Sequence, residues 1–334
     1  MPAPHPWSDD AALGAALALG LDRPVGIEAQ RLAGSLSGAF GSATVALLHY
    51  GSHAQAAGGS SAAGPDSAWD FFVIVDEYGP AYRALAAYLP HRFPGRRAAF
   101  LNRILPPNVL SVPGRDGLVA KCCVLSVHDL ERACSARPAD HFVRARLFQQ
   151  VHLVWARDLR GRDAASRAVC DARWGTYGWG KPFLPGRFDA RQYARTLLDV
   201  SYAGEIRPEG AQHVETLLDA QAATLLPMFE TLLAGLTTRG FLRRSGDAWR
   251  QEHAPGPLAR ALARAWFGWS KLRATLRWLK YVALYDDWLD YVVRKVERKS
   301  GVTMELTERE RRWPLIFLWP RALRFITRRP RRSP

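Results

Sequence analysis

Two apolar runs, separated by a glycine-serine turn and a loop of small residues, constrain this chain most. The runs ATVALLHY (43–50) and WDFFVIVD (69–76) are rich in β-branched and aromatic residues, so both are predicted to be buried strands. Gly51-Ser52 follows the first run, and Asp70 enters the second. A strand, a flexible loop and a second strand would explain this pattern without any function. Alternatively, the turn holds a phosphate chain and the aspartate holds a metal ion.

The turn has suitable chemistry for phosphate. A glycine at a strand end lets backbone N–H groups approach phosphate oxygens closely, and the Ser52 hydroxyl adds a donor. A carboxylate on the neighbouring strand can hold Mg²⁺ against the same phosphates, so Asp70 is the first candidate ligand. The position two residues earlier is Ala68. The second candidate is Asp66, about 13 Å upstream in an extended strand, and Asp116 is the third.

The N-terminal half predicts a mixed sheet of at least four strands. The segment NVLSVPGRDGLVAKCCVLS (108–126) is typical of a hairpin with Asp116-Gly117 at its turn. Segments 127–136 and 140–155 have patterns typical of helices.

From about residue 155 the strand signal fades, and segments 191–204, 211–236 and 257–284 have helical periodicity. The last segment carries an apolar seam that is expected to dock on the domain core. The seam residues are Leu262, Trp266, Trp269, Leu272, Leu276 and Leu279. The predicted fold class is therefore α+β, with a mixed-sheet domain (1–155), a helical domain (156–290) and a tail (291–334).

The charge of the chain points to an anionic partner. The net charge is +15 and the pI is near 10.2, which favours nucleic acid, an acidic membrane surface or a phosphorylated substrate. An arginine-rich composition of the source genome is the alternative explanation. The four cysteines form neither a CxxC pair nor a disulfide framework, so a reducing compartment is expected.

The tail RERRWPLIFLWPRALRFITRRPRRSP (309–334) joins an apolar, tryptophan-containing patch to six arginines after Pro320. A basic segment with large apolar neighbours suits an interfacial anchor on anionic lipid, and each basic residue near such a surface contributes about 1 kcal/mol. A solubilising tail or a nucleic-acid arm would have similar charge. We favour the membrane over nucleic acid because of the large aliphatic neighbours.

Four segments resemble the Tam41 family of mitochondrial-type phosphatidate cytidylyltransferases, within the DNA polymerase β-like nucleotidyltransferase superfamily. The first is YGS…DSAWDFFVIVD, with Tyr50, Gly51 and Ser52 in its turn. The second is the hairpin, in which Lys121 follows the Asp-Gly turn by four residues. The third is FVRARLFQQV, with a central Arg146. The fourth and most specific is DVSYAGEIR (199–207).

The resemblance implies a nucleotidyltransferase domain that transfers CMP from CTP to phosphatidate, with Mg²⁺, at a membrane surface. It implies that Asp70, Lys121 and Asp66 are catalytic, with Asp70 and Asp66 as metal ligands. The residues that it implies for nucleotide binding are Tyr50, Gly51, Ser52, Lys121, Arg146, Glu205 and Arg207. The expected location is the cytoplasmic side of the cell membrane, as a peripheral protein.

Two alternatives stay open from the sequence. The same fold could transfer a nucleotide to another acceptor, such as RNA, a protein or a small alcohol. A fold without activity could bind RNA or membrane through its basic surface, which the missing acid at Ala68 favours. The oligomeric state, nucleotide selectivity and acyl-chain preference leave no pattern in the sequence.

Overall fold

The computed structural model describes residues 5–56, 68–89, 93–114, 117–203 and 211–284, together with Val293 and residues 307–309. Several predicted features lie outside the described residues: Asp66, Asp116, Glu205, Arg207 and nearly all of the tail 291–334. The chain divides into two compact units, Met1–Arg277 and Trp278–Pro334. The domain boundaries expected near residues 155 and 290 stay predictions.

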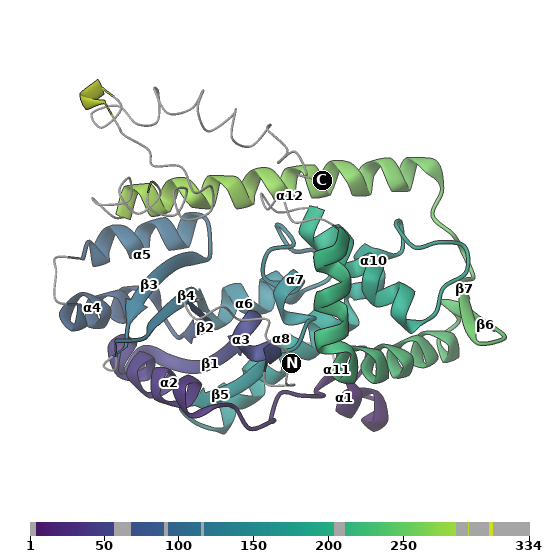
Figure 1. The fold of residues 1–334 in the computed structure, drawn as a ribbon, viewed down its shortest axis with the longest axis horizontal. Coiled ribbons are helices and arrows are strands. Elements are labelled where there is room, and N and C mark those ends of the chain that lie inside the picture. Colours follow the sequence, from purple (N-terminus) through teal and green to yellow (C-terminus); the bar gives the residue numbers. More distant parts are fainter. Residues whose placement is uncertain are drawn as a thin grey trace, which may run out of the picture. The chain divides into compact units, whose positions relative to one another are not determined.

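A five-stranded mixed sheet organises the first half of the chain, as the sequence predicts (Figure 1). Its strand order is β3-β4-β2-β1-β5. Strands β2 and β4 are parallel, and the other neighbouring pairs are antiparallel. The strands are β1 (Thr44–Tyr50), β2 (Trp69–Val75), β3 (Asn108–Pro113), β4 (Val119–Ser126) and β5 (His152–Ala156). The α+β fold class with a mixed sheet is confirmed.

The helix expected over 140–155 is wrong for most of its length. Only α7 (Arg144–Leu147) is helical there, and the end of the segment is β5. β5 pairs antiparallel with β1 at the sheet edge, where His152 lies opposite His49. The available sheet edge overrides a local pattern that fits a helix, which is a tertiary effect.

One face of the sheet packs against α6 (Val127–Cys134), α7 and α8 (Leu159–Trp174). Tyr50, Phe72 and Cys123 lie on this face, in a core that also contains Leu147 and Val169. Side chains two residues apart on a strand share a face. Residues 70 and 121 therefore lie on the same face as Phe72 and Cys123.

Further helices complete the sheet part. They are α2 (Ile27–Phe40), α4 (Tyr78–Tyr88) and α5 (Gly95–Ile104). Buried amides tie α5 to the strands, since Asn102 donates to the Val124 carbonyl at 3.0 Å and to the Tyr82 hydroxyl at 3.1 Å. The short helix α3 (Ser52–Ala56) follows the turn after β1.

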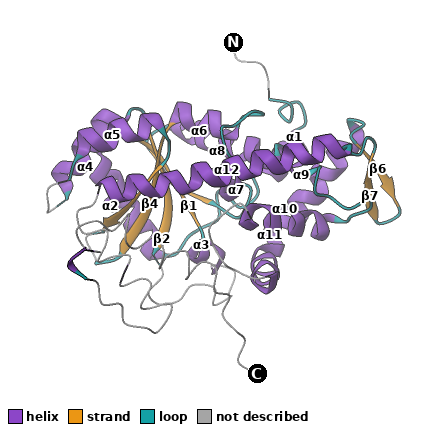
Figure 2. Ribbon diagram, turned by 90° about the horizontal axis from the view of Figure 1, so that it is seen from above, coloured by secondary structure: helices purple, strands orange, loops and turns teal. Residues whose placement is uncertain are grey.

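The rest of the unit is mostly helical, as predicted, and is packed around a second core. Its helices are α1 (Ala11–Leu17), α9 (Thr176–Gly180), α10 (Ala190–Ala203), α11 (Ala211–Thr238) and the start of α12 (Pro257–Leu284). A hairpin of β6 (Leu242–Ser245) and β7 (Ala248–Gln251) was not expected. Both views place it away from the five-stranded sheet (Figures 1 and 2).

The expected docking of the α12 seam on the core is wrong. Leu262 is 63% exposed, Trp269 53%, Leu272 49% and Leu276 39%. The buried face of α12 instead carries Phe267, Ser270 and Arg277. This face is buried for two reasons. Phe267 packs against the rings of Trp179 in α9 and of Phe183 in the loop after it. Arg277 forms an ion pair with the buried Asp140. Trp266 is partly buried, and the Leu279 side chain lies outside the described residues.

Among the described residues, no helix combines the length and the apolarity that crossing a membrane requires.

Candidate functional site

Three neighbouring strands bring the predicted site residues into one row. Tyr50, the last residue of β1, lies opposite Asp70 on β2 in the antiparallel ladder. Asp70 lies opposite Lys121 on β4 in the parallel ladder. The sheet therefore places the turn after β1, the aspartate and the lysine side by side, although 70 residues separate the first from the last.

The turn is closed tightly over the aspartate. Gly51 has φ of +83°, in the left-handed region that glycine adopts without strain. A Cβ atom at this position would lie 2.6 Å from Oδ2 of Asp70. Only a residue without a side chain lets the carboxylate approach the backbone of the turn this closely. This contact explains why a glycine follows Tyr50.

Asp70 is paired with Lys121 through an oxygen that accepts no aligned hydrogen bond from the described residues. Its Oδ1 atom lies 3.3 Å from Nζ of Lys121, and the two side chains are 20% and 37% exposed. Oδ1 is nevertheless buried and accepts no aligned hydrogen bond within the described part of the chain. The carboxylate thus faces a cation at a partly open position rather than the apolar core.

Tyr50 supports the turn from the core side. Its ring stacks on Phe72 with centroids 4.5 Å apart, and its hydroxyl lies 3.1 Å from Sγ of Cys123. Burial raises the pKa of the Tyr50 hydroxyl well above its ordinary value, and the nearby Cys123 and Asp70 add to the effect. Because the Tyr50 side chain is buried, only the backbone of Tyr50 is placed for the contact with a nucleotide that the sequence predicts.

Arg146 of α7 belongs to the same face of the sheet. Its positive charge acts on both Tyr50 and Cys123, lowering their pKa values against the larger effect of burial. Its guanidinium lies over the Phe142 ring, 3.8 Å from the centroid, and donates to the Phe142 carbonyl at 2.8 Å. Two basic side chains thus place positive charge on the face of the sheet that carries Asp70: Lys121 beside Asp70 itself and Arg146 near Tyr50 and Cys123.

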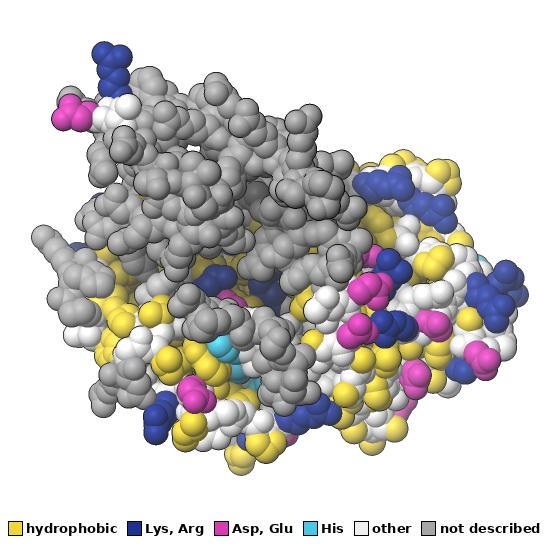
Figure 3. All heavy atoms as spheres, in the orientation of Figure 1, with side chains coloured by type: hydrophobic (Ala, Val, Ile, Leu, Met, Phe, Trp, Pro, Cys, Tyr) yellow, Lys and Arg dark blue, Asp and Glu magenta, His cyan; other side chains and the backbone are white. Residues whose placement is uncertain are grey.

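Aromatic and histidine side chains beside the turn were missed by the sequence reasoning. His53 stacks on Trp69 with centroids 4.0 Å apart and planes at 12°. The ring centroid of His49 lies 5.4 Å from that of the Trp69 indole and 6.3 Å from that of His152. His53 adjoins Ser52 and Trp69 adjoins Asp70 in the sequence, and this is the signal that could have marked these two residues. The space-filling view shows basic, acidic and histidine side chains close together on this side of the molecule (Figure 3).

The buried histidines are neutral at physiological pH. Burial, together with the smaller effects of His152 and His53, lowers the pKa of His49 to about 3. Burial also lowers the pKa of His152. Within the described ranges, no group of three or more His, Cys, Asp and Glu side chains could hold a metal ion on its own.

The residues at the turn fit a magnesium ion that arrives with a nucleotide. Mg²⁺ is usually held by one or two carboxylates together with substrate phosphates and water. Asp70 supplies one carboxylate with a buried oxygen that accepts no hydrogen bond within the described residues. The second predicted ligand, Asp66, lies outside those residues.

No protein-family model matches this chain, and no curated protein sequence matches it.

Proposed function

We propose that this protein transfers CMP from CTP to phosphatidate, giving CDP-diacylglycerol and pyrophosphate at an anionic membrane surface. The observation that carries the proposal is the contact of the Asp70 carboxylate with the Gly51 turn, with the Lys121 ammonium 3.3 Å away. A backbone turn, a carboxylate and a cation in this arrangement suit a magnesium-bound triphosphate. The four sequence segments that resemble the phosphatidate cytidylyltransferases support the choice of nucleotide and acceptor.

Each residue has a separate role in this mechanism. The backbone amides after Tyr50 and the Ser52 hydroxyl bind phosphate oxygens of CTP. Lys121 neutralises charge on the triphosphate as a compact cation, and Asp70 would hold Mg²⁺. Mg²⁺ bound there would supply charge stabilisation to the departing pyrophosphate.

The acceptor requires little from the protein beyond positioning. An oxygen of the lipid phosphate attacks the α-phosphorus of CTP in line, and the bond to the pyrophosphate oxygen breaks. The acceptor phosphate is already ionised near neutral pH, so the site needs no general base. Burial lowers the pKa of His49 and of His152, which makes both of them weak bases.

Labelled CTP, Mg²⁺ and phosphatidate vesicles test the proposal. The wild-type protein should form labelled lipid, and Asp70→Asn should lose most of this activity, by a factor of 100 or more. Asp76→Asn is the matched control, because Asp76 follows the other end of β2 and pairs there with Arg157. It should keep near-normal turnover.

Other outcomes overturn the proposal in distinct ways. Label in RNA or in protein would keep the nucleotide site and change the acceptor. No turnover with any acceptor would leave a fold that binds without catalysis. Equal activity in Asp70→Asn and the wild type would remove Asp70 from the site.

A further inference from the structure

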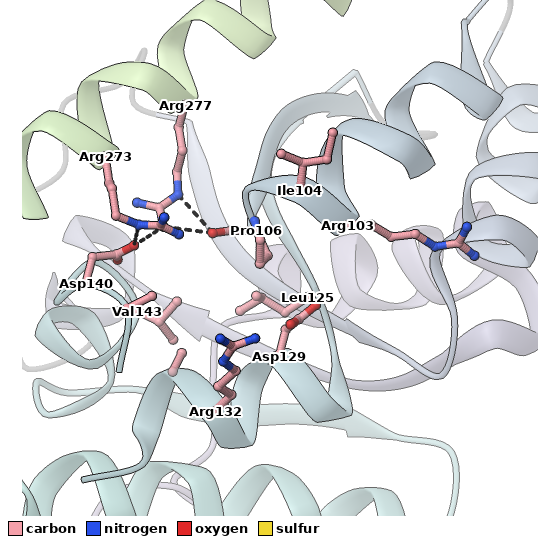
Figure 4. Close-up of a pocket in the computed structure, with 12 residues that line it drawn as sticks. Arg103, Ile104, Pro106, Leu125, Asp129, Arg132, Asp140, Val143, Arg273 and Arg277 are labelled. Carbon is pink, nitrogen blue, oxygen red and sulfur yellow. Dashed lines mark hydrogen bonds and ion pairs between the residues drawn. The ribbon is translucent and has the colours of Figure 1, made fainter. Parts of the chain in front are cut away.

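A second charged site lies at the other end of β4. A cavity of about 200 Å³ is lined by the end of α5 and the loop that follows it, the end of β4, α6, the segment before α7, and α12. Four arginines and two aspartates line it: Arg103, Arg132, Arg273, Arg277, Asp129 and Asp140. Arg273 and Arg277 enter it from α12, and Arg132 lies on the opposite wall (Figure 4).

Asp140 fixes one side of the cavity. Its carboxylate is 6% exposed and accepts from Nε of Arg273 at 3.0 Å and from Nη2 of Arg277 at 2.5 Å. Burial alone would raise the pKa of Asp140, but the charge of Arg277 and the hydrogen bonds of both arginines lower it. Asp140 is therefore ionised, and its negative charge offsets part of the positive charge of Arg273 and Arg277.

Positive charge remains after these pairs are counted. Asp129 accepts hydrogen bonds from the Tyr78 and Ser126 hydroxyls, which are neutral. Four cationic against two anionic side chains leave a formal charge of +2 in the cavity wall. Arg103 and Arg132 make no side-chain hydrogen bond or ion pair with the rest of the described chain.

Arg277 keeps an unused donor in this wall. Its Nε and Nη2 atoms donate to the Pro106 carbonyl at 3.0 and 2.7 Å, and Nη2 also binds Asp140. Its Nη1 atom is buried and has no hydrogen-bond partner among the residues that the structure describes. The side chain is only 5% exposed. A buried guanidinium with an unpaired N–H group is costly.

An exposed apolar surface adjoins the cavity. On α12, Leu272 and Leu276 directly precede Arg273 and Arg277 and belong to a solvent-exposed stripe with Leu258, Leu262 and Trp269. On α5, Phe100 is 61% exposed and Ile104, which lines the cavity, is 62% exposed. No acidic residue occurs between Pro257 and Leu284. An apolar stripe with basic neighbours suits the interface of an anionic membrane.

We propose that this cavity binds the phosphomonoester headgroup of a membrane lipid, while the exposed stripe of α12 contacts the bilayer interface. A phosphomonoester carries a charge of about −1.5 to −2 near neutral pH, which matches the +2 of the cavity wall. A phosphodiester headgroup carries less charge. The inference deepens the proposed function and rests on it for the identity of the lipid as substrate.

The cavity is a lipid-binding site separate from the reacting atoms. Leu125, which lines it, lies four residues after Lys121 on the same face of β4, about 13 Å along the strand. The Phe142 ring lies between the two sites, with Arg146 3.8 Å and Arg277 4.8 Å from its centroid. Lipid held in the cavity is thereby collected beside the nucleotide site.

Vesicle binding by the full chain, without CTP or Mg²⁺, tests the inference. Phosphatidylcholine vesicles carry either phosphatidate or phosphatidylglycerol at equal surface charge. Arg103→Ala with Arg132→Ala should weaken binding to phosphatidate vesicles roughly 30-fold and affect phosphatidylglycerol vesicles much less. Arg160→Ala with Arg167→Ala removes the same charge from exposed positions on α8 and should change binding less than threefold.

The apolar stripe has its own pair of variants. Leu272→Gln with Leu276→Gln should weaken binding to both kinds of vesicle. Leu159→Gln, at a residue that is 77% exposed on α8, should leave binding unchanged. Equal effects of the stripe and control variants would overturn the contact of α12 with the bilayer.

Three results would overturn the headgroup site. Equal losses in the two arginine pairs would mean a general effect of charge. Loss of calorimetrically measured inorganic phosphate binding with intact vesicle binding would mean a site for free phosphate. Weaker binding of single-stranded RNA with intact vesicle binding would mean a nucleic-acid surface. Because Asp70→Asn should bind vesicles normally, failure of this inference and failure of the proposed catalysis give different results.

Discussion

At the residue scale, Gly51 links the sequence pattern to the geometry of the site. Its positive φ lets the chain leave β1, and its missing side chain makes room for the Asp70 carboxylate. A residue with a side chain at this position would be destabilised by the left-handed backbone conformation and by the collision of its Cβ atom with Asp70. These two costs can be separated, because Gly117 has a similar φ of +77° with no atom within 4 Å of an added Cβ.

Gly51→Ala should lower the free energy of unfolding by more than Gly117→Ala. The left-handed conformation costs both variants about 1–3 kcal/mol, and only Gly51→Ala adds a Cβ atom 2.6 Å from Oδ2 of Asp70. Gly51→Ala should also lose CMP transfer, since the carboxylate must move. Urea denaturation and the labelled-CTP assay measure the two effects. If the two alanine variants are equally stable and active, the turn does not position Asp70.

The sequence predicted the central residues of the site but not their setting. Gly51 and Asp70 were named from a local pattern and Lys121 from the resemblance to the cytidylyltransferases, and the ladders place them together. No local sequence pattern predicts that His53 stacks on Trp69, because the stack depends on how α3 folds back over the start of β2. The Tyr50 ring faces the core because strand side chains alternate.

At the scale of elements, α12 is held by its polar residues as well as by Phe267. Arg273 and Arg277 join the helix to Asp140, which lies between α6 and α7. Arg277 also binds the Pro106 carbonyl, just after α5. These contacts set the rotation of the helix about its axis, and that rotation leaves the apolar stripe exposed.

Asp140→Asn should destabilise the protein by about 3–5 kcal/mol at pH 7, because it leaves two largely buried arginines without their anion. The exposed carboxylate of Asp22, paired with Arg162, provides the control, and Asp22→Asn should have little effect. Urea denaturation measures both.

The same pair gives a prediction about pH. The pKa of Asp140 is lowered in the folded protein from its ordinary value of 3.8. The stabilisation by the carboxylate is thus fully present above pH 3.8 and is lost as pH falls through the lower, folded-state pKa. The stability difference between the wild type and Asp140→Asn should therefore shrink only below about pH 4. A constant difference down to pH 2 would contradict an ionised Asp140.

At the scale of the whole molecule, the proposed nucleotide and lipid sites lie on one face of the sheet, toward opposite ends of β4. Removal of Mg²⁺ with a chelator should therefore abolish CMP transfer and leave binding to phosphatidate vesicles unchanged. Parallel transfer and flotation assays measure the two. Loss of vesicle binding on chelation would mean that the lipid is held through the metal rather than by the arginines.

The sequence by itself determined four of the five strands of the sheet and the residues at the turn. Continuous apolar runs, a glycine-serine turn and an Asp-Gly hairpin are local patterns, and the structure confirms β1, β2, β3 and β4 where these patterns occur. Only the tertiary structure decided that β5 extends the sheet, that the stripe of α12 faces outward and that arginines gather around Asp140. The reason is sequence distance, because Arg277 meets Asp140 and Pro106 across 137 and 171 residues, and no local pattern encodes which partners meet.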